Sequence, residues 1–269
     1  MLRPRIIPCL LVRNKGLVKT VRFREEKYVG DPINAVRIFN EKEADELIVL
    51  DIDATAKGRE PDMKMIGFWA AECRMPLCYG GGVKTVEEAK AIINLGVEKV
   101  ALSSAAVENP ELVAAIAEEV GNQSVVVVLD VKKTGGKYAI WTHNATRNSG
   151  QCPIEISMKL QTLGAGEIVL NSIDHDGEMK GYDFEIAARV RESVTIPMSV
   201  LGGAGSLKDI GSLIQRFGII GAAAGSLFVF KGIYKAVLIN YPNQTVKDRL
   251  IQDSLPPDRL HSRRQLPTC

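Results

Sequence analysis

Four short segments rich in glycine and serine are the strongest candidates for chemistry in this chain. Glycine lets the backbone approach a bound anion closely, and a helix that starts just after such a loop offers free N–H groups to that anion. Serine hydroxyls add further hydrogen-bond donors. We therefore predict sites that bind phosphate or similar anionic groups. The residues concerned are Gly81 and Gly82, Ser103 and Ser104, Gly202 and Gly203, and Gly225 and Ser226.

A plainer interpretation of any one loop is that its glycines allow a tight turn between a strand and a helix. The pairing of the loops favours anion binding, because residues 79–82 recur as 201–205, about 120 residues later. Two opposed phosphate sites are therefore predicted. Asp176 and Gly177 follow another strand end, where a turn and a ligand contact fit equally well.

Eight short apolar runs supply the frame for these loops. Most are followed by a segment of helical character, such as 86–95, 110–120, 184–192 and 207–217. Short strands that alternate with helices of about ten residues indicate βαβ units and a parallel sheet. The runs are 6–12, 47–51, 76–79, 99–102, 125–130, 168–171, 196–201 and 219–223.

Two architectures compete for these units: a single closed (β/α)₈ barrel and an open, doubly wound sheet. The length of 269 residues is close to the roughly 250 typical of one barrel. Residues 46–50 recur as 167–170, and 101–105 recur loosely as 223–227, again about 120 residues apart. A barrel divides into two equal halves, whereas an open sheet predicts no such repeat, so we predict the barrel.

The domain organisation follows from the extent of this pattern. Residues 1–252 are predicted to form the barrel. Residues 253–269 are rich in proline and arginine and show no periodicity, so they are predicted to be a mobile tail without chemistry.

Composition narrows the class of protein. Apolar residues make up 46% and charged residues 25%, as in ordinary globular enzymes, and the net charge of +2 predicts no general attraction to nucleic acid or membranes. The five cysteines form no CxxC pair, and the three histidines suggest neither a triad nor a metal site. No window approaches the roughly 20 apolar residues that span a bilayer. We expect a cytoplasmic protein without metal or cofactor.

Several motifs closely resemble one family, the cyclase subunit of imidazole glycerol phosphate synthase (the HisF family). The resemblance covers roughly residues 1–250 and implies a (β/α)₈ barrel duplicated from half-barrels. It also implies a protein that takes ammonia from a glutaminase partner, passes it through the barrel and uses it on a bis-phosphate substrate. The motifs are residues 5–10, 30–32, 79–82, 105–110, 172–177, 181–183 and 202–205.

The resemblance assigns Arg5, Glu46, Lys99 and Glu167 to the charged ring at the family's ammonia entrance. These residues begin predicted strands, so they can converge at the N-terminal face of the barrel. Opposite charges there can pair, and pairing lets charged groups remain in a desolvated place. An ordinary ion-pair layer that plugs the barrel is the alternative. The resemblance favours an ammonia gate with a glutaminase subunit docked on it as a heterodimer.

The most important departure from the family concerns its two catalytic aspartates. Asp130 matches the second of them, but Leu11 stands where the first is expected. Leucine cannot move a proton, and loss of a positioned acid or base typically costs roughly 10²–10⁴-fold in rate. Lys19 is kept on the first long loop, where the resemblance implies a flexible cation that closes over an anionic substrate.

Four wall positions also depart from the family. The family tends to have threonine, asparagine, threonine and serine where this chain has Asp53, Ser103, Asn171 and Leu201. Changes at one catalytic position and several wall positions, with the gate intact, point to a changed substrate. The chain resembles relatives associated with surface-polysaccharide genes, which implies ammonia used for acetamidino groups on sugars. A nucleotide-linked amino sugar would then be the acceptor.

Three other functions remain open. The chain is a true cyclase of histidine biosynthesis if Asp53 replaces the missing acid, although a solvated loop carboxylate explains Asp53 slightly better. It is a non-catalytic scaffold if it only channels ammonia and activates its glutaminase. The related single-chain phosphoribosyl isomerase fits less well, since it needs no gate.

Overall fold

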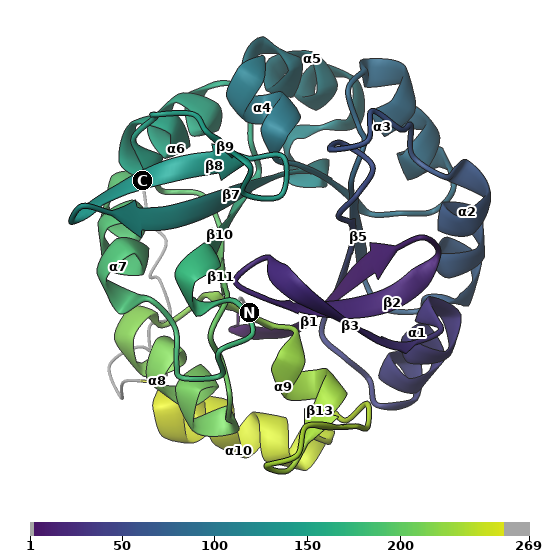
Figure 1. Ribbon diagram of the computed structural model, residues 1–269, viewed down its shortest axis with the longest axis vertical. Coiled ribbons are helices and arrows are strands. Elements are labelled where there is room, and N and C mark those ends of the chain that lie inside the picture. Colours follow the sequence, from purple (N-terminus) through teal and green to yellow (C-terminus); the bar gives the residue numbers. More distant parts are fainter. Residues whose placement is uncertain (1–2, 256–269) are drawn as a thin grey trace, which may run out of the picture.

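Eight parallel strands close into a barrel in the computed structural model, which describes residues 3–255 (Figure 1). The strands follow one another around the barrel in chain order, and the pairing of β7 with β10 completes the ring. The architecture is therefore a single (β/α)₈ barrel, as predicted. The barrel strands are β1 (Arg5–Arg13), β4 (Leu47–Asp51), β5 (Leu77–Gly80), β6 (Lys99–Leu102), β7 (Val125–Thr134), β10 (Glu167–Ser172), β11 (Met198–Leu201) and β12 (Gly221–Ala224).

Helices surround the strands, and Figure 1 shows them as an outer ring. Two of them begin with a capping box, in which the N-cap hydroxyl and the third helical residue satisfy each other's backbone N–H groups. These are α3, capped by Thr85, and α8, capped by Ser206. Each follows a glycine loop of the sequence repeat, so the duplication extends to helix capping. The helices are α1 (Pro32–Glu41), α2 (Met63–Glu72), α3 (Val86–Asn94), α4 (Ser104–Glu108), α5 (Glu111–Val120), α6 (Pro153–Thr162), α7 (Phe184–Ser193), α8 (Leu207–Phe217), α9 (Ser226–Val229) and α10 (Gln244–Ser254).

The sequence did not predict several short strands that project beyond the barrel. Strands β2 (Gly16–Val21) and β3 (Arg24–Gly30) form an antiparallel flap after β1, and β8 (Lys137–Thr142) folds back on β7, followed by β9 (Arg147–Asn148). A further hairpin joins β13 (Phe230–Lys231) to β14 (Ala236–Val237). Most residues of β3 are exposed and polar, so they lack the alternation that identifies a half-buried strand.

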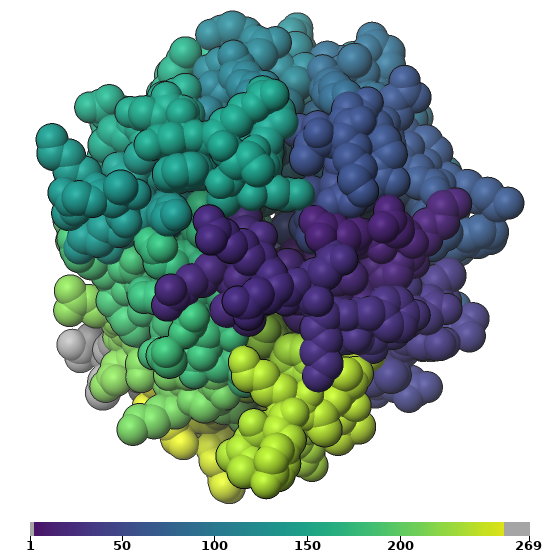
Figure 2. Space-filling view, viewed as in Figure 1, coloured from purple at the N-terminus to yellow at the C-terminus, as the bar shows by residue number. Residues whose placement is uncertain are grey.

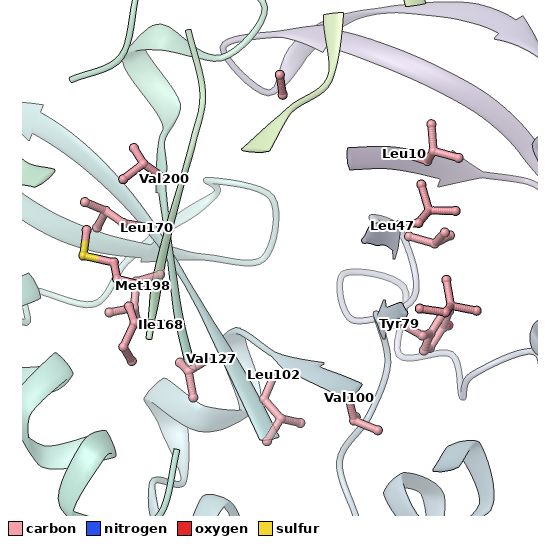
Figure 3. Packing of buried hydrophobic residues seen from close by; sticks show 14 of the residues in the cluster. Leu10, Leu47, Tyr79, Val100, Leu102, Val127, Ile168, Leu170, Met198 and Val200 are labelled. Carbon is pink, nitrogen blue, oxygen red and sulfur yellow. The ribbon is translucent and has the colours of Figure 1, made fainter. Parts of the chain in front are cut away.

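The core has two layers because successive side chains of a strand point to opposite faces. The outer layer packs between the strands and the helices, and Figure 3 labels ten of its members, from Leu10 on β1 to Val200 on β11. The inner layer fills the barrel and is apolar apart from two thiols. Its buried members are Ile7, Cys9, Ile48, Cys78, Ala101, Val126, Val128, Val169, Leu201 and Ala223.

The structure describes only the first residues of the predicted C-terminal tail, up to residue 255. Helix α10 ends at Ser254, so its last two residues fall in the segment 253–269 for which a tail is predicted. From residue 256 onward that segment lies outside the described residues.

Candidate active site

A pocket lies at the C-terminal ends of the barrel strands, where active sites of such barrels are built. In the space-filling view, the purple N-terminal segments cross the centre of this face and leave a narrow hollow beside them (Figure 2). All the sequence-predicted substrate residues, and Asp130, line this one pocket. They are Lys19, Gly81, Gly82, Ser103, Ser104, Asp130, Asp176, Gly177, Gly202, Gly203, Gly225 and Ser226.

Asp130, on the barrel face of β7, is the central ionisable group of the pocket. Its carboxylate accepts hydrogen bonds from Asn171 Nδ2 at 2.8 Å and from Ser103 Oγ at 3.2 Å. Burial nevertheless dominates and raises the pKa of Asp130 to about 7, with a further contribution from the charge of Asp176. A carboxyl group with such a pKa can take up or release a proton near neutrality.

The wall of the pocket on the side of β1 is apolar. Leu11 on β1 lies in register with Leu50 on β4, and both pack against the inner layer of the core. Leu201 on β11, in register with Asn171, is also buried there. Leu11 and Leu50 therefore line the pocket across the barrel from Asp130, whereas Leu201 lies beside Asn171 on the strand next to β10.

The glycines of the predicted phosphate loops are required by close backbone packing. A side chain on Gly81 (φ +120°) would place its Cβ 2.3 Å from the carbonyl oxygen of Asp51, and one on Gly203 (φ +109°) would lie 2.1 Å from that of Gly181. The turn interpretation thus accounts for these two glycines without any ligand.

The helix starts near the serines have backbone N–H groups that no side chain caps. Helices α4 and α9 begin at Ser104 and Ser226, in corresponding places of the two halves, and neither has a side-chain cap. Their first N–H groups are therefore not satisfied by a capping side chain. The serine hydroxyls are partly engaged, since Ser103 donates to Asp130 and Ser104 Oγ accepts from the backbone N–H of His143 at 3.0 Å.

Lys19 differs from the flexible loop cation that was predicted. It lies on strand β2, only 4% of it is exposed, and its Nζ donates to the carbonyl oxygen of Cys9 at 2.6 Å. The side chain packs against Gly225, where an added Cβ would lie 2.5 Å from Nζ. Burial lowers the pKa of Lys19. The pairing of β2 with β1 draws this residue inward, so its charge is already inside the pocket.

Asp176 and Gly177 hold the flap over the pocket. Asp176 Oδ2 accepts hydrogen bonds from Thr20 Oγ1 at 2.7 Å and from the N–H of Phe23 at 3.2 Å. Gly177 has a φ of +68°, and a Cβ there would lie 2.2 Å from the carbonyl oxygen of Thr20. Both residues also line the pocket, so they position the flap and remain available to a ligand.

We expect Asp176→Ala to loosen the flap by about 1–3 kcal/mol, because Thr20 and Phe23 would lose a partly buried, charged acceptor. Trypsin should then cleave faster at the exposed Arg22 and Arg24. Asp174→Ala is the matched control, because Asp174 accepts from the N–H of Lys133 and does not contact the flap. Equal cleavage rates in the two variants would contradict this role.

Asp53 lies neither in the pocket nor in solvent, so both interpretations of it were wrong. Only 3% of it is exposed, and its carboxylate pairs with Arg13 at 2.8 Å and with Lys57. Burial alone would raise its pKa, but these two cations lower it below the usual value. A carboxylate held ionised in this way is a poor substitute for a proton donor.

Asp51 is the carboxylate of this loop that does line the pocket. Its Oδ1 accepts from the N–H groups of Asp53 and Ala54, both at 3.1 Å, and lies 3.5 Å from Arg59. Its place as the last residue of a predicted strand is a sequence signal for a pocket residue that the prediction for Asp53 did not use.

The four residues of the predicted gate meet in one cluster at the opposite end of the barrel. Glu167 Oε1 lies 2.7 Å from Arg5, and Lys99 Nζ lies 2.9 Å from Glu167 and 2.8 Å from Glu46, which also pairs with Arg5. Both carboxylates are almost fully buried. Burial would raise the pKa of Glu167, but Arg5 and Lys99 lower it to about 2.

Ser199 is a fifth member of this cluster that the sequence analysis missed. Its Oγ donates to Glu167 at 2.6 Å and lies 3.5 Å from Arg5. Gly221 makes room for it, since a Cβ at that position would lie 1.8 Å from the hydroxyl. The periodicity could have revealed Ser199, because it lies two residues before Leu201 on the same face of β11.

Other pocket residues were also missed because they belong to the projecting strands. His143 and Asn144 follow β8 and line the pocket, as does Phe23 at the flap turn. Asn144 donates to the carbonyl oxygen of Ile52, and His143 Nδ1 lies 3.5 Å from Glu108. The sequence gives little signal for them, because they lie in turns with positive φ values that are formed without glycine.

Within residues 3–255, no group of three or more His, Cys, Asp and Glu side chains is arranged to hold a metal ion. No helix in that part of the chain is long and apolar enough to cross a membrane.

Comparisons with known proteins agree with this geometry. A family model described as "Histidine biosynthesis protein" matches residues 5–235. A Vibrio vulnificus protein named "Putative imidazole glycerol phosphate synthase subunit hisF3" is 59% identical over 94% of this chain and 98% of its own length. A Leptospira interrogans protein with the corresponding HisF name is 57% identical over 93% of this chain and 99% of its own length.

More distant relatives carry the plain family name. The "Imidazole glycerol phosphate synthase subunit HisF" of Exiguobacterium sibiricum is 40% identical over 85% of this chain and 91% of its own length. The barrel, the pocket at its C-terminal face and the buried charged ring at its other end accord with these matches. The chain therefore belongs to the histidine biosynthesis protein family and is a HisF-type cyclase subunit.

Proposed function

We propose that this chain is the synthase subunit of a glutamine amidotransferase complex and uses ammonia on a phosphate-bearing acceptor other than the histidine precursor. The observation that carries the proposal is a complete charged ring at one end of the barrel combined with Leu11 at the other. The ring suits ammonia entry, whereas the leucine removes a group that the usual cyclisation needs.

The ring supports a glutaminase partner at the N-terminal face. Its two buried carboxylates and two cations neutralise one another, so the ring stays in place without solvent. Beyond it the barrel interior is apolar. Such an interior favours neutral ammonia over ammonium, since an unpaired ion there is strongly disfavoured.

The two halves of the pocket support an acceptor with two anionic groups. Ser104 and Gly82 lie in one half, and Ser226 and Gly203 in the other. The helix starts at Ser104 and Ser226 have no side-chain caps, and Lys19 adds a buried positive charge between the loops. A pyrophosphate or two separate phosphates would complement this arrangement.

The apolar wall of the pocket supports an acceptor that differs from the histidine precursor. Leu11 and Leu201 both line the pocket and stand where the family resemblance implies polar residues, so the pocket can pack against an apolar or ring-shaped part of its ligand. A nucleotide-linked amino sugar that receives an acetamidino group fits this requirement. Asp130 would then serve as the proton acceptor or orient the incoming ammonia.

A second candidate is the ordinary cyclase of histidine biosynthesis, and Asp51 is the observation that favours it. Asp51 puts a carboxylate in the pocket on the strand next to Leu11. It could take over the role of the missing acid, which Asp53 cannot because of its ion pairs.

The test is an assay of the purified chain with excess ammonium and the bis-phosphate precursor of histidine biosynthesis, following formation of imidazole glycerol phosphate. We expect turnover at least about 10²-fold below that of an ordinary cyclase, because Leu11 cannot move a proton. Leu11→Asp should not restore it, since Leu201 and Asn171 also alter the wall.

Leu50→Asp is the matched control, because it introduces the same charge on the neighbouring strand in register with Leu11. Turnover of the unmodified chain near that of an ordinary cyclase would refute the changed acceptor. Recovery in Leu11→Asp but not in Leu50→Asp would show that the pocket still fits the histidine precursor, in favour of the second candidate.

A further inference from the structure

A second hollow, which we call the side hollow, lies at the rim of the barrel between Met179, Leu227 and the hairpin of β13 and β14. Figure 1 shows this hairpin next to α9, at the outer edge of the barrel. The side hollow has a volume of about 460 Å³, within the roughly 300–1,000 Å³ typical of sites for small organic molecules. None of the residues assigned so far to the charged ring or to phosphate binding lines it.

The side hollow is continuous with one half of the pocket. Met179, on the loop after β10, lines both spaces. On the loop after β11, Gly203 lines the pocket and Gly205 lines the side hollow. On α9, Ser226 lines the pocket and Leu227 the side hollow. A ligand with a phosphate beside Gly203 and Ser226 can therefore extend into the side hollow without leaving the protein.

The walls of the side hollow suit the faces of a flat ring. Met179, Leu227 and Ile233 supply thioether and aliphatic surface from three different segments, and Phe230 adds an aromatic side chain. Ile233 lies at the turn of the hairpin and is 88% exposed, so a ring bound there would remove apolar surface from water. Exposed apolar side chains around a concave surface are typical of ligand-binding grooves.

Asn240 offers a hydrogen-bond acceptor beside these apolar walls. Its Nδ2 donates to the carbonyl oxygens of Leu238 at 3.0 Å and of Leu227 at 3.5 Å. Its own carbonyl oxygen, Oδ1, has no partner among residues 3–255 and can accept an N–H from a ligand. Nucleobases combine apolar faces with N–H groups on their edges, so they match both features of the side hollow.

Positive charges surround the side hollow. Lys231 lines it, and Lys27 Nζ on β3 donates to the carbonyl oxygen of Lys235 at 3.2 Å, which joins the flap to the hairpin. All three lysines are exposed. Glu178 lies next to Met179 in the chain, but it is already paired with two other cations. This excess of positive charge favours a ligand that carries phosphates over a neutral one.

We propose that the side hollow binds the nucleoside part of the acceptor, so that the pocket and the side hollow together take a nucleoside diphosphate with a sugar attached. The inference deepens the proposed function and rests on it for the reaction, whereas binding can be measured on the chain alone. The nucleoside would occupy the side hollow, the diphosphate would lie along Gly203 and Ser226, and the sugar would face Asp130. A hairpin that only packs loosely predicts no preference for a nucleoside.

The test compares UDP, CDP, ADP and GDP with inorganic pyrophosphate as ligands of the full chain, by isothermal titration calorimetry at fixed pH and ionic strength. We expect at least one nucleoside diphosphate to bind about tenfold or more tightly than pyrophosphate, because only its nucleoside reaches the apolar walls. Ile233→Ser should weaken that ligand by roughly three- to tenfold, since part of the isoleucine burial is lost, and leave pyrophosphate unchanged.

Tyr234→Ser is the matched control, because Tyr234 is the next residue, is 89% exposed and does not line the side hollow. It should change neither affinity. Leu227→Ala changes the opposite wall, and it should also weaken the nucleoside diphosphate but not pyrophosphate. The selective loss in both variants would not follow from general damage to the fold.

NMR of the methionine methyl groups gives a readout that does not depend on affinity. The ring current of a bound base should shift the signal of Met179, whereas Met158 on α6, which is 50% exposed and outside the side hollow, should not respond. The inference is overturned if no nucleoside diphosphate binds more tightly than pyrophosphate, if Ile233→Ser and Tyr234→Ser have the same affinities, or if the Met179 signal does not move.

The two proposals can fail separately. Ammonia-dependent conversion of a phosphate-bearing acceptor, in a chain without preference for nucleosides, would refute the subsite and leave the proposed function intact. Nucleoside binding that depends on Ile233, in a chain that never uses ammonia, would support the subsite and contradict the proposed function.

Discussion

Replacing Arg5 by leucine is expected to lower the free energy of unfolding by about 3–5 kcal/mol at pH 8. Arg5 bridges Glu46 and Glu167, whose side chains are 4% and 6% exposed. Without it, Lys99 alone would face two buried carboxylates, so one negative charge would remain uncompensated. Urea unfolding at pH 8 and pH 4 measures the loss.

The pH dependence has a definite sign. Arg5 and Lys99 hold the pKa of Glu167 at about 2, so in the unmodified chain the pair contributes stability that is lost only as the pH falls toward that value. In the variant, the pKa of Glu167 should rise, and protonation would relieve the unpaired charge. The destabilisation should therefore be smaller at pH 4 than at pH 8.

Arg3→Leu is the control, because it makes the same change two residues away. Arg3 is 45% exposed, and its partner Asp45 keeps a hydrogen bond from Lys247 at 2.9 Å, so we expect a loss of less than about 1 kcal/mol. Equal losses of unfolding free energy in both variants would mean that Arg5 stabilises the fold no more than an exposed arginine does. A gate-dependent function also predicts that Arg5→Leu uncouples glutamine hydrolysis from ammonia use.

The sequence predicted the barrel because its regular elements carry local signals. Buried parallel strands such as Val125–Val128 are continuous apolar runs, and capped helices such as α3 have recognisable starts. The flap and β8 were not predicted, because their strands are short and partly polar and their register depends on contacts with the barrel. Lys19 was therefore placed on a loop rather than inside the pocket.

The pocket was predictable to the extent that position along a strand determines direction. Asp130 is the last residue of a predicted strand and the glycine loops follow predicted strand ends, and all of them line the same pocket. The environment of each group was not predictable, because it depends on partners distant in sequence. Asp53 is explained by Arg13, 40 residues away, and the amide of Asn171 by its hydrogen bond to Asp130, 41 residues away.

Asp130→Asn is expected to stabilise the fold above pH 7 while abolishing the chemistry of the pocket. Burial raises the pKa of Asp130 to about 7, so the native chain keeps a proton there that the unfolded chain loses near pH 4. The stability associated with this proton is complete below the unfolded pKa and is lost as the pH rises through 7. Asparagine never ionises, so the variant should gain on the order of 2–4 kcal/mol at pH 8 and close to nothing at pH 4.

Thermal unfolding at the two pH values tests the stability side of this prediction. Asp174→Asn is the control, because the amide oxygen can still accept from the N–H of Lys133, so its stability should change little at either pH. A melting temperature of Asp130→Asn that never exceeds that of the unmodified chain would mean that Asp130 is solvated and ordinary.

The activity of Asp130→Asn distinguishes a catalytic barrel from one that only delivers ammonia to another protein. If Asp130 accepts a proton as a general base, ammonia-dependent turnover should fall by about 10²–10⁴-fold in Asp130→Asn, and the activity of the unmodified chain should decline as the pH drops below about 7. If the barrel only delivers ammonia to another protein, Asp130→Asn should leave glutamine-dependent transfer nearly unchanged. Because the same substitution stabilises the fold, a loss of activity could not be attributed to unfolding, and the carboxylate itself would be responsible.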